Sequence, residues 1–422
     1  MTRALALALG AVWIAAGAAA AEPYGYPFDD PWVATVVGTP KEYQADLPEK
    51  IPAKRAAITV FADRTVPEVF WYDQKLRYAY AVQKRPAPLV FIISGTGGSY
   101  DSEANRTIAR AFYQAGFHVV GLSSPTHPNF IVSASTTAVP GHAFKDAEDL
   151  YRVMERVRDE LRSKISVTDF YVTGYSLGGF NAGFVTWLDE QKRVFNFKKA
   201  LMINPPVRLY SSISLLDRLT DNIPGGEDNF AQFYDKLVKA FAEIYKRSDQ
   251  IEFDDDFLYR AYETLHPKNE ELAALIGVVF RLSSADLAFT SDVMTNFGYV
   301  KPKNVYLTKN TSLTEYMRVT MRLGFTDFYH DFFYPFYKAR DPSATREGLI
   351  EEMSLTSIED YLRNTDKVEV MTNEDDLILE PGEIDFFRRV FGDRATIYPK
   401  GGHFGNLAYR DNVAHMVSVF KH

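Results

Sequence analysis

The central part of the chain alternates short apolar runs with longer amphipathic segments, which predicts strands joined by helices. Continuous apolar runs typical of buried strands occupy residues 88–93, 118–122, 169–173 and 199–205. Helical spacing of apolar positions marks residues 103–115 and 145–161 between them. Because such strands are buried on both faces, the pattern predicts a mostly parallel sheet flanked by helices.

Upstream of this region the pattern is that of an antiparallel meander. Its strands are predicted at three runs rich in β-branched and aromatic residues, at 57–61, 69–72 and 76–82. Residues 22–56 precede them and are rich in Pro, Tyr and Asp, which predicts an extended N-terminal arm.

The alternation breaks after residue 206 and returns near residue 365. Residues 207–364 have a mainly helical pattern, with the clearest helices predicted at 230–246 and 270–281. The returning elements are strands at 367–372 and 395–398 and helices at 381–391 and 412–420. We therefore expect one α/β domain, residues 57–206 and 365–422, with a central sheet of about eight strands and a large helical insertion.

The first 21 residues have the layout of a secretory signal peptide. Arg3 makes the start positive, an apolar run follows to Ala16, and residues 18–21 form an A-x-A cleavage site. We expect cleavage after Ala21 and export, to the periplasm or the medium of a bacterium. An uncleaved membrane anchor is the alternative, although the run is short for a full span. We expect no stable membrane span after cleavage, because no later segment is an unbroken apolar run of sufficient length.

Composition narrows the possible chemistry. The chain contains no cysteine, which excludes disulfides, thiolate metal sites and cysteine nucleophiles. An exported protein without disulfides needs a large core, and 46% hydrophobic residues, with 14% aromatic, are enough to form one. The formal net charge of −8 gives no electrostatic reason to expect nucleic acid or an anionic membrane surface as a partner.

The predicted strand at 169–173 leads directly into Gly174-Tyr175-Ser176-Leu177-Gly178, and a helix-compatible segment follows. Glycines two residues before and after the serine permit a sharp strand-to-helix turn that holds the serine in a strained geometry. The helix N-terminus behind it offers free N–H groups to a developing negative charge. The five-residue motif also occurs in ordinary turns, but its place between a strand and a helix makes Ser176 a candidate nucleophile.

An activated serine needs a base to take its proton and an acid to orient that base. On a parallel sheet both are expected in loops at the carboxyl ends of strands. The strand at 367–372 is followed by an acidic loop, in which Asp376 is the first candidate for the acid, Asp375 the second and Glu374 the third. A solvated acidic turn that caps the next helix is the alternative for any two of these carboxylates.

His403 is the candidate base. It lies in the glycine-flanked loop Gly401-Gly402-His403, directly after the last predicted strand. Of the other histidines, His127 is in a comparable strand-end loop. The rest fall at a strand start, near or within predicted helices, in the helical insertion or at the C-terminus.

The oxyanion of a tetrahedral intermediate needs two backbone donors. One is expected to be the N–H of Leu177, directly after the serine. The other is expected from the loop Ser94-Gly95-Thr96-Gly97-Gly98-Ser99, as the N–H of Thr96 or Gly97. A phosphate-cradling loop is the competing interpretation, but no Gly-Lys-Ser/Thr follows the glycines.

In this order, the S-G-T-G-G loop, the G-Y-S-L-G turn, the Asp376 loop and the G-G-H loop resemble the α/β-hydrolase superfamily. The resemblance covers about residues 57–205 and 367–422. It implies a Ser-His-Asp hydrolase without a metal or an organic cofactor, and it implies that residues 207–364 are its cap. Two features differ: the first loop is not the usual H-G-x-G, and the insertion matches no cap that we can identify.

The sequence therefore predicts an exported serine hydrolase that cleaves a small-molecule or lipid carboxylic ester through an acyl-enzyme intermediate. A peptidase or an acyltransferase would use the same residues. The alternative from another class is a non-catalytic protein of the cell envelope that binds a lipid or a partner protein on the same fold. The aromatic residues of 325–337 are expected either to pack the cap onto the sheet or to line an apolar acyl pocket.

Overall fold

We describe residues 24–247 and 255–421 of a computed structural model of the chain. The predicted signal peptide, residues 1–21, lies outside the described residues.

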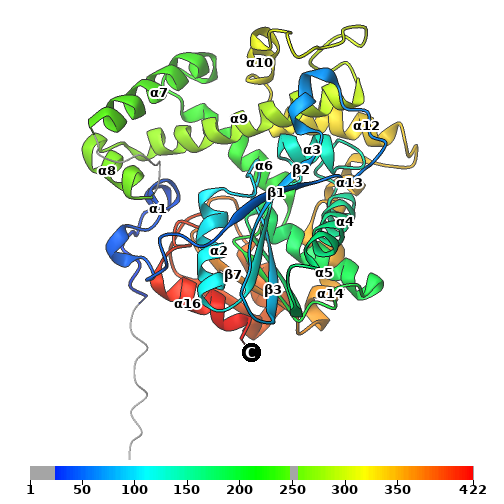
Figure 1. Ribbon diagram of the computed structural model, residues 1–422. Coiled ribbons are helices and arrows are strands. Elements are labelled where there is room, and N and C mark those ends of the chain that lie inside the picture. Colours follow the sequence, from blue (N-terminus) through cyan, green and yellow to red (C-terminus); the bar gives the residue numbers. More distant parts are fainter. Residues whose placement is uncertain (1–23, 248–254, 422) are drawn as a thin grey trace, which may run out of the picture.

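An eight-stranded sheet forms the centre of the molecule (Figure 1), in the order β1-β2-β4-β3-β5-β6-β7-β8. The strands are β1 (Lys54–Ile58), β2 (Leu76–Ala81), β3 (Ala87–Ile93), β4 (His118–Leu122), β5 (Val167–Tyr175), β6 (Lys199–Ile203), β7 (Val368–Asn373) and β8 (Ala395–Tyr398). β2 is antiparallel to both β1 and β4, and β4, β3 and β5 to β8 are parallel to one another. The prediction of a mostly parallel sheet of about eight strands is confirmed.

Helices cover both faces of this sheet. The strand β3 shows why the central strands are apolar at every position. Leu89, Phe91 and Ile93 pack into the core formed with α4 (Ala143–Leu161), α5 (Leu177–Lys192) and α15 (Ile384–Phe391). Val90 and Ile92 pack into the opposite layer, formed with α2 (Glu103–Gln114) and α16 (Arg410–Val419). Successive side chains of a strand point to opposite faces, so burial on both faces requires an unbroken apolar run.

The prediction of a strand at residues 69–72 is wrong. These residues belong to a 3₁₀ helix, η2 (Glu68–Asp73), which follows Pro67. Its Val69 and Phe70 are buried in a small cluster with Val132 of α3 (Pro128–Ser133) and Phe289 of α9 (Asn269–Thr295). Packing against these two helices therefore outweighs the β-propensity of the segment.

The N-terminal arm is also not extended throughout. It contains the helix α1 (Pro31–Val37) and the 3₁₀ helix η1 (Lys41–Tyr43). The Asp30 carboxylate accepts the N–H groups of Trp32 (2.8 Å) and Val33 (3.2 Å), and Pro31 occupies the first helical position. An Asp cap followed by proline is a helix-start signal. Because α1 is short, it is stabilised mainly by tertiary contacts on both of its sides.

Between β6 and β7 the described residues form helices and no strand. The longer helices of this segment are α6 (Leu209–Arg218), α7 (Phe230–Arg247), α8 (Asp255–Leu265) and α9, followed by α10 (Thr314–Thr320), α11 (Phe325–Asp327), the π-helix η5 (Phe328–Phe333), α12 (Tyr334–Lys338), α13 (Arg346–Glu352) and α14 (Glu359–Asn364). Short 3₁₀ helices are η3 (Leu219–Asn222), η4 (Glu227–Asn229) and η6 (Leu355–Ile358), and η7 (Gly392–Arg394) precedes β8. Figure 1 shows α7, α8, α9 and α10 together on one side of the sheet.

The helix α9 is long and apolar enough to cross a membrane by length and composition, with a mean hydropathy of 1.7 in its most apolar window. The helix is not the unbroken apolar run of the expectation, because Arg281 and Asp286 interrupt it, and the absence of a membrane span stays a prediction. Moreover, 67% of that window is buried inside the protein, where α9 packs against α1, α6 and η3. The apolar surface of α9 is thus largely used in packing within the chain.

The loop after β4 contains His127, the N-cap of α3. Its Nδ1 accepts the N–H of Asn129 (3.1 Å), a role that only the neutral ring can perform. Burial, and secondarily the charge of Arg77, lowers the pKa of His127 from 6.5 to about 4. The unfolded chain therefore binds a proton more readily than the native state between these values. The contribution of His127 to native stability is complete above pH 6.5 and is lost as the pH falls towards 4.

The His127→Asn variant keeps an acceptor at the N-cap but does not titrate. Between pH 7 and pH 5 we expect the free energy of unfolding to fall less in this variant than in the wild type, by about 2 kcal/mol at most. Urea denaturation at both pH values measures the difference. Equal losses in the two proteins would contradict a neutral His127 in the native state.

Candidate active site

Ser176 lies in the turn between β5 and α5. This turn leaves no room for a side chain two residues before the serine or two residues after it. The serine's φ of 54° and ψ of −127° are rare for residues other than glycine. A Cβ at Gly174 would lie 2.4 Å from the carbonyl group of Gly178, and one at Gly178 would lie 2.0 Å from the carbonyl oxygen of Ile93. Both glycines are therefore required by the close approach of α5 to β3 and β5.

The structure brings Ser176, His403 and Asp376 together beyond the carboxyl ends of β5, β8 and β7. The Nε2 atom of His403 lies 2.9 Å from Ser176 Oγ. Its Nδ1 atom lies 2.9 Å and 3.2 Å from the two carboxylate oxygens of Asp376. All three residues are buried, with exposed fractions of 6% or less. This is the arrangement of a nucleophile, a base and an orienting acid.

The other two carboxylates of the acidic loop point elsewhere. Asp375 accepts the N–H groups of Gly401 (3.2 Å) and Gly402 (2.9 Å), so it holds the loop that carries His403. Glu374 forms a partly exposed ion pair with Arg388. Of the three candidates, Asp376 is the one whose carboxylate contacts the imidazole.

Asn204 is a site residue that the sequence analysis missed. It follows β6, and its Nδ2 donates to Asp376 Oδ2 (2.7 Å), while the N–H of Ile378 donates to Asp376 Oδ1 (3.2 Å). The φ of Asn204 is 44°, a region in which Asn is enriched. An asparagine at the carboxyl end of a parallel strand, directly before two prolines, is the signal that could have identified it.

The loop between β3 and α2 lies against the nucleophile turn, since a Cβ at Gly95 would be 2.9 Å from the ring of Tyr175. The N–H of Gly97 donates to the hydroxyl of Thr126 (2.8 Å), so this predicted oxyanion donor already has an acceptor. Among the hydrogen bonds of the described residues, none uses the N–H of Thr96 or of Leu177. Thr96 and Leu177 are thus the available pair of donors.

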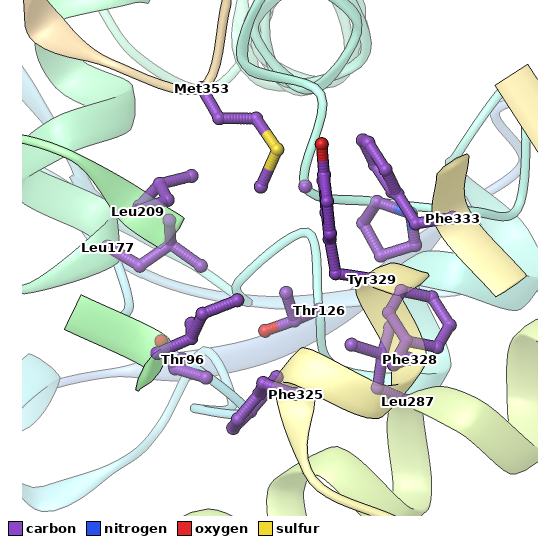
Figure 2. Close-up of a pocket in the computed structure, with 13 residues that line it drawn as sticks. Thr96, Thr126, Leu177, Leu209, Leu287, Phe325, Phe328, Tyr329, Phe333 and Met353 are labelled. Atoms are coloured by element: carbon purple, nitrogen blue, oxygen red, sulfur yellow. The ribbon is translucent and has the colours of Figure 1, made fainter. Parts of the chain in front are cut away.

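An apolar cavity of about 60 Å³ lies beside Thr96 and Leu177 (Figure 2). Four of its lining residues come from the aromatic stretch 325–337, namely Phe325, Phe328, Tyr329 and Phe333. The other lining residues are Thr126, Pro140, Gly141, Leu209, Ile213, Leu287 and Met353. Phe332 and Phe336 of the same stretch are buried in the main core and do not line the cavity. Phe325, Phe328, Tyr329 and Phe333 belong to the same core, so the stretch packs against the sheet as expected, and the acyl pocket stays a prediction.

Metal ligands do not accompany the site. Across residues 24–247 and 255–421, no three His, Asp or Glu side chains converge as a metal ion would require.

No family model matches the chain, and no curated protein matches it in sequence. Among solved structures, the chain is similar to one of two fungal esterases from Rhizomucor miehei, at 14% identity and a TM-score of 0.42, over 89% of this chain and 85% of that one. It is similar to an esterase from Pyrococcus furiosus at 10% identity and a TM-score of 0.41, over 88% and 91% of the two chains. It is also similar to the thioesterase domain of the curacin biosynthetic pathway at 10% identity and a TM-score of 0.40, over 88% and 100%. At these values the fold assignment rests on the strand order and geometry of this chain.

Mutation of Asp376 and mutation of Asp375 are expected to change the reactivity of Ser176 to different extents. Asp376→Asn is expected to slow phosphonylation of Ser176 by a fluorophosphonate probe about ten-thousandfold, because the imidazole loses its orienting carboxylate. Asp375→Asn keeps one acceptor for the backbone of the His403 loop, and the rate is expected to fall about tenfold or less. Time-resolved labelling of both variants measures these rates. A larger loss in Asp375→Asn would identify the wrong acid.

Three features of the chain now agree. β2 and the parallel strands β3 to β8 form a sheet in the order of the α/β-hydrolase fold, and the serine occupies the strained turn between β5 and α5. Ser176, Asp376 and His403 follow one another along the chain in the Ser-Asp-His order of that fold. The chain has the α/β-hydrolase fold.

Proposed function

We propose that the protein is an exported serine hydrolase that cleaves carboxylic esters. The proposal is carried by one observation: Ser176 Oγ lies 2.9 Å from His403 Nε2, and the Nδ1 of the same ring lies 2.9 Å from Asp376. A serine in this contact loses its proton to the imidazole as it attacks, and the carboxylate stabilises the imidazolium that forms. The signal-peptide pattern at residues 1–21 supports export.

Acylation begins when Ser176 Oγ attacks the ester carbonyl carbon and His403 Nε2 takes the hydroxyl proton. The N–H groups of Thr96 and Leu177 donate to the oxyanion of the tetrahedral intermediate. In comparable sites one such donor contributes about 3 kcal/mol to transition-state stabilisation. The intermediate collapses as the ester C–O bond breaks, and His403 gives its proton to the leaving alcohol. The acyl group remains on Ser176.

Deacylation repeats these steps with water. His403 takes a proton from water as its oxygen attacks the acyl carbon, and the same two N–H groups hold the second oxyanion. When the bond to Ser176 Oγ breaks, His403 returns the proton to the serine. The acid product leaves and the enzyme is regenerated.

The apolar cavity is the proposed site of the acyl group. Leu177, which follows Ser176 in the chain, lines it together with Thr96, and aliphatic and aromatic side chains form most of the rest. A volume of about 60 Å³ holds roughly four to six groups of the size of a water molecule or a methylene. This size favours short to medium acyl chains over long ones.

A peptidase or an acyltransferase would use the same triad, and a non-catalytic lipid- or partner-binding protein could share the fold. A protein that only binds a ligand has no need for three buried groups in hydrogen-bond contact. This argument favours an enzyme, and the small apolar cavity favours a hydrophobic acyl group over a peptide side chain with charge.

The exported protein, expected to begin at Glu22, should hydrolyse p-nitrophenyl esters and react with a fluorophosphonate probe. Ser176→Ala should abolish labelling and reduce hydrolysis by at least about a thousandfold, because the nucleophile is lost. A panel of esters, peptide amides and acyl-acceptor alcohols separates hydrolase, peptidase and acyltransferase activities. A folded wild type that neither labels nor turns over any of them would favour the non-catalytic alternative.

Chain-length preference tests the acyl cavity. Wild type should prefer butyrate to hexanoate esters over acetate, and Met353→Ala should shift the optimum towards longer chains by opening the cavity. Met416→Ala is the matched control, since Met416 is fully buried on the opposite face of the sheet. Both variants should lose about 2–5 kcal/mol of stability, but Met416→Ala should keep the wild-type profile. A profile that is flat or peaks at acetate would contradict the assignment of this cavity.

A further inference from the structure

The N-terminal arm packs on the loop that carries His403. The hydroxyl of Thr39 donates to the carbonyl of Gly405 (2.9 Å), and Asn406 Nδ2 donates to the hydroxyl of Tyr24 (2.9 Å). Lys400 forms an ion pair with Asp29 (2.6 Å). A segment at the start of the chain therefore supports a loop near its end.

The most direct of these contacts is made by Thr35 of α1. Its Oγ1 accepts the N–H of His403 (2.9 Å) and donates to the carbonyl of Pro31 (2.7 Å). The carbonyl of Gly402, in the same peptide group, accepts from Asn373 Nδ2 (2.7 Å). Side chains from α1 and from the end of β7 therefore fix both polar groups of the peptide that precedes the His403 side chain.

The loop comes so close to α1 that side chains are excluded at two positions. A Cβ at Gly402 would lie 2.4 Å from both the Pro31 carbonyl oxygen and Thr35 Oγ1. One at Gly405 would lie 2.0 Å from the carbonyl oxygen of Ala34. Gly402 also has a φ of 57°, which glycine adopts without strain. The glycines beside the histidine thus serve the contact with α1.

On its other side α1 is held by the cap. Val33 and Val37 pack with Leu272 of α9, and the Asp30 carboxylate accepts from Asn269 Nδ2 (2.7 Å). Figure 1 shows α1 between α8 and the hydrolase core. The helix that contacts His403 is therefore itself anchored to α9.

We propose that Thr35 is a positioning residue for His403, supplied by the N-terminal arm. The inference rests on the proposed function. Thr35 touches the backbone of His403 and none of the reacting atoms. The orientation of the 402–403 peptide determines the direction of the Cα–Cβ bond of His403, and so the distance from Nε2 to Ser176 Oγ. A small rotation of this peptide lowers the rate of proton transfer without changing the cavity that binds the acyl group.

The test compares three variants. Thr35→Val keeps the shape of the side chain but removes the acceptor, and Thr35→Ser keeps the hydroxyl. Thr186→Val is the matched control: Thr186 is buried, its hydroxyl donates to the Ala182 carbonyl (2.7 Å), and it lies about 15 Å along α5 from Ser176. Relative to wild type, kcat per titrated active site should fall about tenfold in Thr35→Val, with KM within about twofold. Thr35→Ser should recover most of the loss, and Thr186→Val should leave kcat unchanged.

An equal kcat per titrated site in Thr35→Val and Thr186→Val would overturn the inference. So would a Thr35→Val variant in which fewer molecules can be titrated but each titrated site keeps the wild-type kcat. The proton NMR signal of the His403 Nδ1–H, hydrogen-bonded to Asp376, gives a second readout that needs no substrate. It should shift in Thr35→Val and remain in Thr35→Ser and Thr186→Val. If wild type hydrolyses no ester but this pattern of shifts is observed, the proposed function fails and the positioning role stands. An unchanged signal in Thr35→Val would count against the positioning role.

Discussion

The approach of α5 to β3 at the nucleophile turn is the contact on which the site depends. Gly178 meets the carbonyl of Ile93 with no space for a Cβ, and Ser176 adopts a positive φ between the two elements. Such a conformation costs about 1–3 kcal/mol and persists because surrounding packing over-determines it. The Ser176 N–H donates to Ile203 (2.8 Å), which ties the turn to β6. The turn directs the serine hydroxyl to the carboxyl edge of the sheet and leaves the next N–H unpaired.

The histidine is held differently from the serine, by segments that are distant along the chain. Asp375 accepts the N–H groups of Gly401 and Gly402, Asn373 donates to Gly402, and Thr35 accepts the N–H of His403. Without these contacts the loop Gly401-Gly402-His403 would be free to rotate about its two glycines. Three consecutive N–H groups with hydrogen-bond partners restrict that rotation, which keeps the imidazole between Ser176 and Asp376.

The aromatic stretch of residues 325–337 both packs in the core and lines the cavity. The π-helix η5 contains Phe328, Tyr329 and Phe333, which line the cavity, and Phe332, which packs in the core against Phe328 and Phe336. A π-helix has more residues per turn than an α-helix and frequently occurs at functional sites. Here, rings at neighbouring positions of one π-helix pack in the core and line the cavity. The packing of this segment and the shape of the cavity therefore depend on the same few residues.

Local patterns in the sequence were sufficient for the parallel part of the sheet, the nucleophile turn, and the order of Ser176, an acidic loop and His403. Buried strands require unbroken apolar runs, and a strained turn requires its glycines, so both constraints are written in adjacent residues. Tertiary structure decided what depends on contacts between distant segments. It separated Asp376 from Asp375 by the direction of each carboxylate, gave the N–H of Gly97 to Thr126, and added Asn204 and Thr35. A hydrogen bond between residues 35 and 403 leaves no period or motif in the sequence, because its geometry exists only after the chain has folded.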